Sequence, residues 1–187
     1  MYGMVNKALE EMVIASDCEA TWELVKQRAG VDIDVFVTNQ GYSDDVTYKL
    51  VGATCELLGK TSPEILRAFG KHWVLKTARD GYGNLMDAGG SNLVEFLNNL
   101  PNFHSRVSLI FPHLEPPRFA CTDVTDSSLR LHYYSHRFGL ADFVVGLLDG
   151  LGEQYKTPLA IEHEIIRGSD SDHDVFRVRW DRKNNDD

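Results

Sequence analysis

The sequence has no long run of apolar residues, and none approaches the roughly 18 that a membrane-spanning helix requires. It also has no basic N-terminal stretch followed by an extended apolar segment, which is the pattern of a secretory signal peptide. These absences predict a cytoplasmic protein that does not have a membrane as a partner.

Cysteine is scarce, and acidic residues outnumber basic ones. The three cysteines, Cys18, Cys55 and Cys121, lie too far apart for the spacing of a zinc site or a disulfide framework. The formal net charge is −9, with aspartates accumulating toward Asp186 and Asp187, and this argues against nucleic acid because phosphate binding needs clustered lysine and arginine. Glycine-rich phosphate loops, nucleophile elbows and zinc-hydrolase motifs are missing too, so no enzyme activity is predicted.

The spacing of apolar residues predicts an α+β protein with helices first and an antiparallel sheet, crossed by one helix, afterwards. Helical spacing covers residues 4–13, 20–29, 43–59, 62–69, 92–99 and 140–148, the last helix ending at Gly150 or Gly152. Alternation typical of strands covers residues 119–121, 129–135, 159–165 and 176–180, with turns at 126–128 and 168–172. At 187 residues, of which 43% are hydrophobic, the chain is predicted to form a single domain.

His104 is a candidate iron ligand. It follows Leu100 and Pro101, where the proline can begin a helical turn and the histidine falls on the first exposed face of that turn. A neutral imidazole is a good ligand for iron. The chain has seven histidines, so an ordinary structural histidine is the alternative interpretation.

A Tyr-x-Ser-x-Arg pattern at Tyr133, Ser135 and Arg137 ends one of the predicted strands. The period of two places the three side chains on one face, where two hydroxyls and a guanidinium can bind a carboxylate. Such a cluster suits the paired propionates of a heme, although an ordinary polar strand edge has the same composition. Upstream, Pro112, Pro116 and Pro117 exclude continuous helix, and a proline can also press on a planar ligand.

In combination, these features resemble one family, the H-NOX (heme nitric oxide/oxygen-binding) domain, which is the sensor module also found in the β subunit of soluble guanylate cyclase. The resemblance extends over essentially the whole length. It is carried by Met1-Tyr2-Gly3-x-Val5-Asn6-x-Ala8-Leu9-Glu10, Phe69-Gly70-Lys71, Leu93 to His104, Pro117, and Leu131-His132-Tyr133-Tyr134-Ser135-x-Arg137-x-Gly139-Leu140.

The resemblance implies heme b (iron protoporphyrin IX) as the cofactor, held between a helical N-terminal lobe, 1–60, and a heme-ligating α+β lobe, 61–187. It implies that His104 is the proximal iron ligand and that Pro117 pushes the porphyrin out of plane. The propionates are then expected at Tyr133, Ser135 and Arg137. The remaining heme contacts that it implies are Met1, Tyr2 and Val5 from the first helix, and Trp73 and Phe143 on the distal side.

Phe143 determines which gas is expected. In family members that hold dioxygen, a tyrosine hydroxyl from this helix donates a hydrogen bond to the bound gas, and Phe143 has no hydroxyl. The sequence is therefore similar to the NO-selective branch, with NO and CO as ligands, while Trp73 leaves an O2-binding sensor or carrier as the alternative. A heme peroxidase, with His72 as its distal histidine, is a further alternative.

The implied output is cleavage of the Fe–His104 bond by NO, which passes the signal to a separate protein. In this family that protein is often a histidine kinase or a cyclic-di-nucleotide enzyme.

Overall fold

A computed structural model describes residues 1–111, 114–168 and 170–181 of the chain. The fold is α+β, as predicted: helices come first and a four-stranded antiparallel sheet follows, crossed by one helix. Pro112, Ser169 of the predicted 168–172 turn, and the aspartates at 186 and 187 lie outside the described residues.

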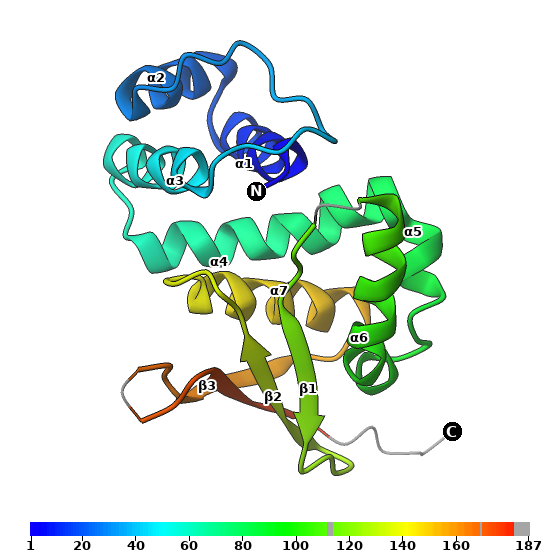
Figure 1. Cartoon of the computed structure of the whole chain (residues 1–187). Helices are drawn as coiled ribbons and strands as arrows, with labels where there is room; N and C mark the ends of the chain where they lie inside the picture. Colours follow the sequence, from blue (N-terminus) through cyan, green and yellow to red (C-terminus); the bar gives the residue numbers. More distant parts are fainter. Residues whose placement is uncertain (112–113, 169, 182–187) are drawn as a thin grey trace.

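Three helices, α1 (Gly3–Ser16), α2 (Glu19–Ala29) and α3 (Asp44–Leu58), form one end of the molecule (Figure 1). Their apolar faces meet around Trp22, which is fully enclosed, and the cluster extends to Phe69 of the following helix. The predicted helix ends at Gly30 and Gly59 are confirmed. The division into lobes at residue 60 stays a prediction.

The next helical stretch is longer than the sequence pattern predicted. Helix α4 (Ser62–His72) begins at a capping box between Thr61 and Glu64, and it continues directly into a π-helical turn, η1 (Trp73–Ala78), and then into α5 (Arg79–Asp87). A π-helix has about one residue more per turn than an α-helix, so its apolar residues do not follow α-helical spacing in the sequence. Such turns are frequent at functional sites. The turn places Trp73 between the two ends of the molecule.

The sheet contains β1 (Arg118–Thr122), β2 (Ser128–Tyr134), β3 (Leu159–Ile165) and β4 (Asp174–Trp180), in the order β1-β2-β4-β3. Helices α6 (Leu93–Ile110) and α7 (Ala141–Gln154) pack on one face (Figure 1). Strand β2 shows the expected alternation, with Leu129, Leu131 and Tyr133 facing the helices. The second hydrophobic core lies between this face and the helices.

Three predicted boundaries were wrong. Helix α6 does not end at residue 99 but runs through Pro101 to Ile110, because a packed helix tolerates a proline when neighbouring contacts compensate for the lost hydrogen bond. Helix α7 continues past Gly150 and Gly152 to Gln154, since these glycines are buried against neighbouring segments. Strand β2 ends at Tyr134, before Ser135.

Helices α4 and α7 cross at unusually short range, and Gly70 and Gly146 permit this. A Cβ atom on Gly70 would lie 2.2 Å from the carbonyl oxygen of Phe143, and one on Gly146 would lie 2.1 Å from that of Arg67. No larger residue fits at either position without moving backbone. The crossing therefore fixes where α7 presents Phe143. Among the described residues, none of the helices has the length and apolar character needed to cross a bilayer.

Candidate functional site

A cavity of about 260 Å³ lies between the N-terminal helices and the sheet with its covering helices. Its wall is mostly apolar and is formed by side chains from α1, η1, α5, α6, α7, β1 and β2. Every site residue predicted from the sequence lines it: Met1, Tyr2, Val5, Trp73, His104, Pro117, Tyr133, Ser135, Arg137 and Phe143. The structure therefore brings together residues that are up to 142 positions apart, counting from Met1 to Phe143 (143 − 1).

His104 projects from the middle of α6 into this cavity. The expected exposed position was wrong: the ring is half-buried and packs near the rings of Phe103 and Phe119, because α6 continues past Pro101 and turns this face inward. Its Nδ1 lies 3.1 Å from the carbonyl oxygen of Pro117, to which it can only donate. Burial lowers the pKa of His104 although this hydrogen bond opposes the shift, so the ring is neutral at pH 7.

This tautomer leaves Nε2 with a free lone pair. Within the described part of the chain, Nε2 forms no hydrogen bond. A ring that donates from one nitrogen to a backbone carbonyl and keeps the other nitrogen free has the arrangement of a metal-ligating histidine. The described residues contain no group of three or more His, Cys, Asp or Glu side chains that could hold a bare metal ion. A single histidine fits an iron whose other ligands come from a porphyrin.

The polar part of the cavity wall comes from the end of β2 and the segment after it. Tyr133 is buried, and burial raises the pKa of its hydroxyl, which stays protonated and able to donate. The backbone N–H of Arg137 donates to Ser135 Oγ at 3.1 Å, which folds the chain back beyond the strand. The three side chains thus share the cavity, but through this turn rather than through strand alternation.

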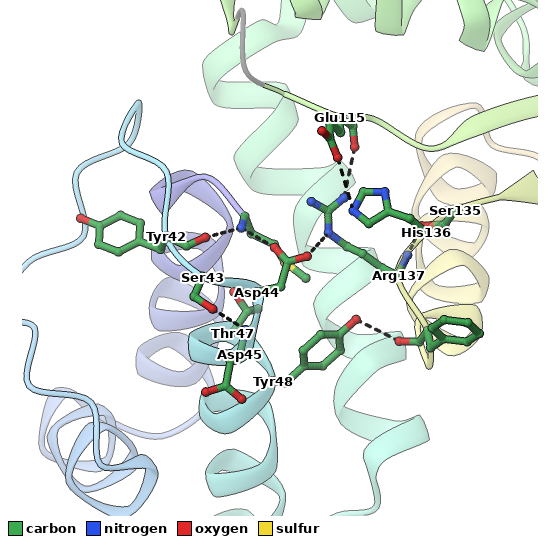
Figure 2. A network of polar contacts seen from close by, with 12 residues as sticks. Tyr42, Ser43, Asp44, Asp45, Thr47, Tyr48, Glu115, Ser135, His136 and Arg137 are labelled. Carbon is green, nitrogen blue, oxygen red and sulfur yellow. Dashed lines mark hydrogen bonds and ion pairs between the residues drawn. The ribbon is translucent and has the colours of Figure 1, made fainter.

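Arg137 is held by an acidic partner from the N-terminal helices (Figure 2). Its Nε lies 2.8 Å from Asp44 Oδ2, and its Nη1 donates to the carbonyl oxygen of Glu115 at 3.1 Å. The N-terminal ammonium of Met1 lies 2.5 Å from Asp44 Oδ1 and 2.6 Å from the carbonyl oxygen of Tyr42. Asp44 therefore connects the start of the chain, α3 and the segment that carries Arg137.

An aromatic cluster forms the part of the wall around Phe143. The ring of Phe143 lies 5.0 Å from that of Phe69 and 6.4 Å from that of Trp73, measured between centroids. The cavity-lining residues of α7 that follow are apolar, including Val144 and Leu147. Phe143 and Phe69 have no donor group, so within this cluster the indole N–H of Trp73 is the group that can donate a hydrogen bond.

The sequence model of one protein family, described as "Haem-NO-binding", matches residues 2–163. The chain belongs to this family. Domains of this family are heme-binding gas sensors.

The soluble guanylate cyclase gcy-31 of Caenorhabditis elegans is 26% identical over 96% of the chain. The rat guanylate cyclase soluble subunit beta-2 is 30% identical over 61% of the chain. The chain spans about a quarter of the length of gcy-31 (26%) and 18% of that of beta-2.

Solved H-NOX structures have the same fold as this Haem-NO-binding domain. An H-NOX protein from S. oneidensis in the Fe(II)NO state matches with a TM-score of 0.88 at 18% identity, covering 97% of this chain and 99% of the other. An oxygen-binding H-NOX domain in complex with oxygen matches with a TM-score of 0.79 at 23% identity, covering 98% and 96%. Because structures with either gas share the fold, the fold does not decide which gas binds here.

Two further residues of this candidate site, Asp44 and Tyr82, were not among those predicted from the sequence. Asp44 follows the N-cap residue Ser43 at the start of α3, and nothing in the sequence connects it to Arg137, which lies 93 positions away. Tyr82 lines the cavity from α5, where its backbone leaves helical geometry between two glycines. The Gly-Tyr-Gly pattern at residues 81–83 was the one available sign of that irregularity.

We expect Asp44→Asn to destabilise the domain by on the order of 1 kcal/mol at pH 7, because a half-buried guanidinium and ammonium lose their shared anion. Burial raises the pKa of Asp44, but hydrogen bonds from the N-terminus and Arg137 outweigh it and lower the pKa below 3.8. A lowered folded-state pKa means stability that is present above the unfolded pKa and is lost as the pH falls through the folded one.

Urea unfolding at pH 7 and along a series of lower pH values measures this effect. Asp45→Asn is the matched control, since Asp45 occupies the same first turn of α3 and pairs with exposed Lys49. The difference between the two variants should shrink toward acid. Equal stabilities at pH 7 would show that the Asp44 network does not stabilise the fold.

Proposed function

We propose that this domain is a ferrous heme b sensor, selective for NO, with His104 as the protein ligand of the iron. The observation that carries the proposal is the 3.1 Å contact between His104 Nδ1 and the carbonyl oxygen of Pro117. The Nδ1 of His104 donates to Pro117, and its free Nε2 belongs to a ring that lines a largely apolar cavity. When bound, the heme supplies the gas-binding iron, and the chain supplies the ligand, the pocket and the response.

We infer that the propionates bind at Tyr133, Ser135 and Arg137, polar side chains in a mostly apolar wall that also contains His104 and Glu115. Arg137 can present its planar guanidinium to a carboxylate while backbone and carboxylate contacts fix its position. With its charged edge at this end, a bound heme would meet Met1, Tyr2 and Val5 at the start of the chain, and Trp73 and Phe143 would line the space for the gas.

NO selectivity follows from the aromatic cluster around Phe143. Bound O2 carries partial negative charge on its outer atom, and that charge is poorly solvated in an apolar pocket. Loss of one hydrogen bond costs about 1–3 kcal/mol, or about one to two powers of ten in affinity. NO bound to ferrous iron is nearly neutral and has no such requirement.

The response starts at His104. His104 would hold the iron, and Pro117, whose carbonyl accepts from the same imidazole, would press on the bound heme; detachment of His104 on NO binding would release this constraint. Helix α6 can then shift between two packed arrangements against its neighbours. CO would leave His104 attached and is therefore expected to signal weakly.

Absorption spectra of the purified ferrous protein test this function. We expect an unliganded spectrum in air, a six-coordinate spectrum with CO and a five-coordinate spectrum with NO. A stable ferrous-oxygen spectrum in air would contradict NO selectivity and support the O2-binding alternative. The indole N–H of Trp73 would then be expected to donate a hydrogen bond to the bound O2. Identical coordination with NO and CO would contradict the proposed response.

The recipient of the signal is proposed to be a separate signalling protein, such as a histidine kinase or a cyclic-di-nucleotide enzyme. The guanylate cyclases it resembles are about four times as long as this chain, which matches 26% of gcy-31. Their cyclase activity is therefore not assigned to it.

A further inference from the structure

The segment 135–139, which joins β2 to α7, carries Ser135 and Arg137 without forming a helix or strand. On one side it is held by the N-terminal helices: the hydroxyl of Tyr48 donates to the carbonyl oxygen of Phe138 at 2.9 Å, and Asp44 pairs with Arg137 (Figure 2). A loop that presents side chains to a ligand needs its backbone fixed on the other side as well.

Arg167, in the connection between β3 and β4, supplies that second support. Its Nη1 donates a hydrogen bond to the carbonyl oxygen of Ser135. Its Cζ lies 4.0 Å from the centre of the Phe138 ring, which is otherwise 69% exposed. The two contacts use the edge and the face of one planar guanidinium at the same time, which a lysine cannot reproduce.

The backbone of Arg167 is itself anchored. Its N–H donates to Asp174 Oδ1 at 3.0 Å, and the same oxygen lies 2.8 Å from His163 Nε2. Asp174 is 8% exposed and occupies the start of β4, paired with Tyr133 of β2. Arg167 does not line the cavity, so its contact with the site runs through the backbone of Ser135.

We propose that Arg167 is a positioning residue that fixes the Ser135–Phe138 segment for carboxylate binding. This inference rests on the proposed heme site and deepens it. The match to the family ends at residue 163, so family membership assigns no role to Arg167. By fixing the carbonyl of Ser135, Arg167 also fixes the turn in which Ser135 Oγ accepts from the backbone of Arg137.

The test uses the heme-loaded chain and the variants Arg167→Ala and Arg167→Lys. Heme transfer to excess apomyoglobin gives the rate of heme loss, and resonance Raman spectra give the propionate bending modes and the Fe–His stretch. Arg179→Ala is the matched control, since Arg179 lies in the same hairpin and pairs with exposed Glu162. Thermal unfolding of each variant measures stability separately.

We expect Arg167→Ala to speed heme loss about five- to tenfold and to shift the propionate modes without changing the Fe–His stretch. Arg167→Lys should give a smaller shift in the same direction, and Arg179→Ala should match the parent. Parent-like propionate modes in Arg167→Ala overturn the proposal, even if that variant melts earlier. If Arg167→Ala does not fold, Arg167→Lys tests the proposal instead. Propionate modes in Arg167→Lys that match those of the parent would then overturn the proposal.

The parent protein and His104→Gly are measured first. If the parent does not retain heme, or if His104→Gly retains it normally, the proposed function fails, and the role of Arg167 fails with it. If both behave as proposed, the Arg167 variants test the positioning role alone.

Discussion

His104→Gly is expected to reduce the heme content of the purified protein by about tenfold or more, because loss of even an outer-shell partner costs about 10- to 100-fold in metal affinity. The substitution removes the imidazole that lines the cavity and leaves space for a free imidazole. Heme should therefore return when imidazole is added to the medium. Absorption at the Soret band, with and without imidazole, measures both effects.

His72→Gly is the matched control. His72 is also a half-buried histidine in a helix, but its side chain does not line the cavity. The His72→Gly substitution also puts a glycine inside a helix, which lowers stability by roughly 1 kcal/mol, but it leaves the proposed iron ligand unchanged. A His104→Gly protein with a normal five-coordinate ferrous spectrum in the absence of imidazole would assign the ligand to another residue.

Much of the fold follows from local chemistry in the sequence. Helix α3 begins after its N-cap Ser43, whose side chain accepts from the backbone of Asp45, and it ends before Gly59, as capping residues predict. Strand β2 alternates as its sequence does, because one face lies on the core and the other faces solvent. These rules act over a few residues, and a single sequence shows them directly.

The wrong boundaries came from packing that local rules do not contain. Pro101 should end a helix, but α6 continues because Phe96 and Leu97 before it and Phe103 after it are held in one hydrophobic core. The π-helical turn at Trp73 has no spacing signal of its own. Tertiary contacts override propensity in both cases.

In the candidate site, too, part could be predicted from the sequence and part depends on tertiary contacts. Its residues could be named from a family pattern, and all of them line one cavity. The partners that orient them could not be named, since Asp44 and Arg167 reach Arg137 and Ser135 across separations of 93 and 32 residues. A charged pair formed by the fold leaves no trace in the spacing of residues.

Phe143→Tyr is the substitution expected to change ligand choice most. The crossing of α4 and α7 at Gly70 and Gly146 fixes the backbone here, so the new hydroxyl extends along the direction of the present ring. In the proposed arrangement it reaches the gas-binding side of the cavity. A tyrosine in such a pocket can donate a hydrogen bond to bound O2, whose outer atom carries negative charge.

We expect the ferrous Phe143→Tyr protein to form a stable oxygen spectrum in air, where the parent shows none, with a gain of about 10- to 100-fold in O2 affinity from one hydrogen bond. Phe69→Tyr is the control, since the ring of Phe69 lies 5.0 Å from that of Phe143 but does not line the cavity. Trp73→Phe, added to Phe143→Tyr, separates the hydroxyl from the indole donor. Oxygen binding that persists in Trp73→Phe/Phe143→Tyr assigns the effect to the hydroxyl. If Phe143→Tyr stays unliganded in air, the side chain at position 143 does not control the choice between NO and O2.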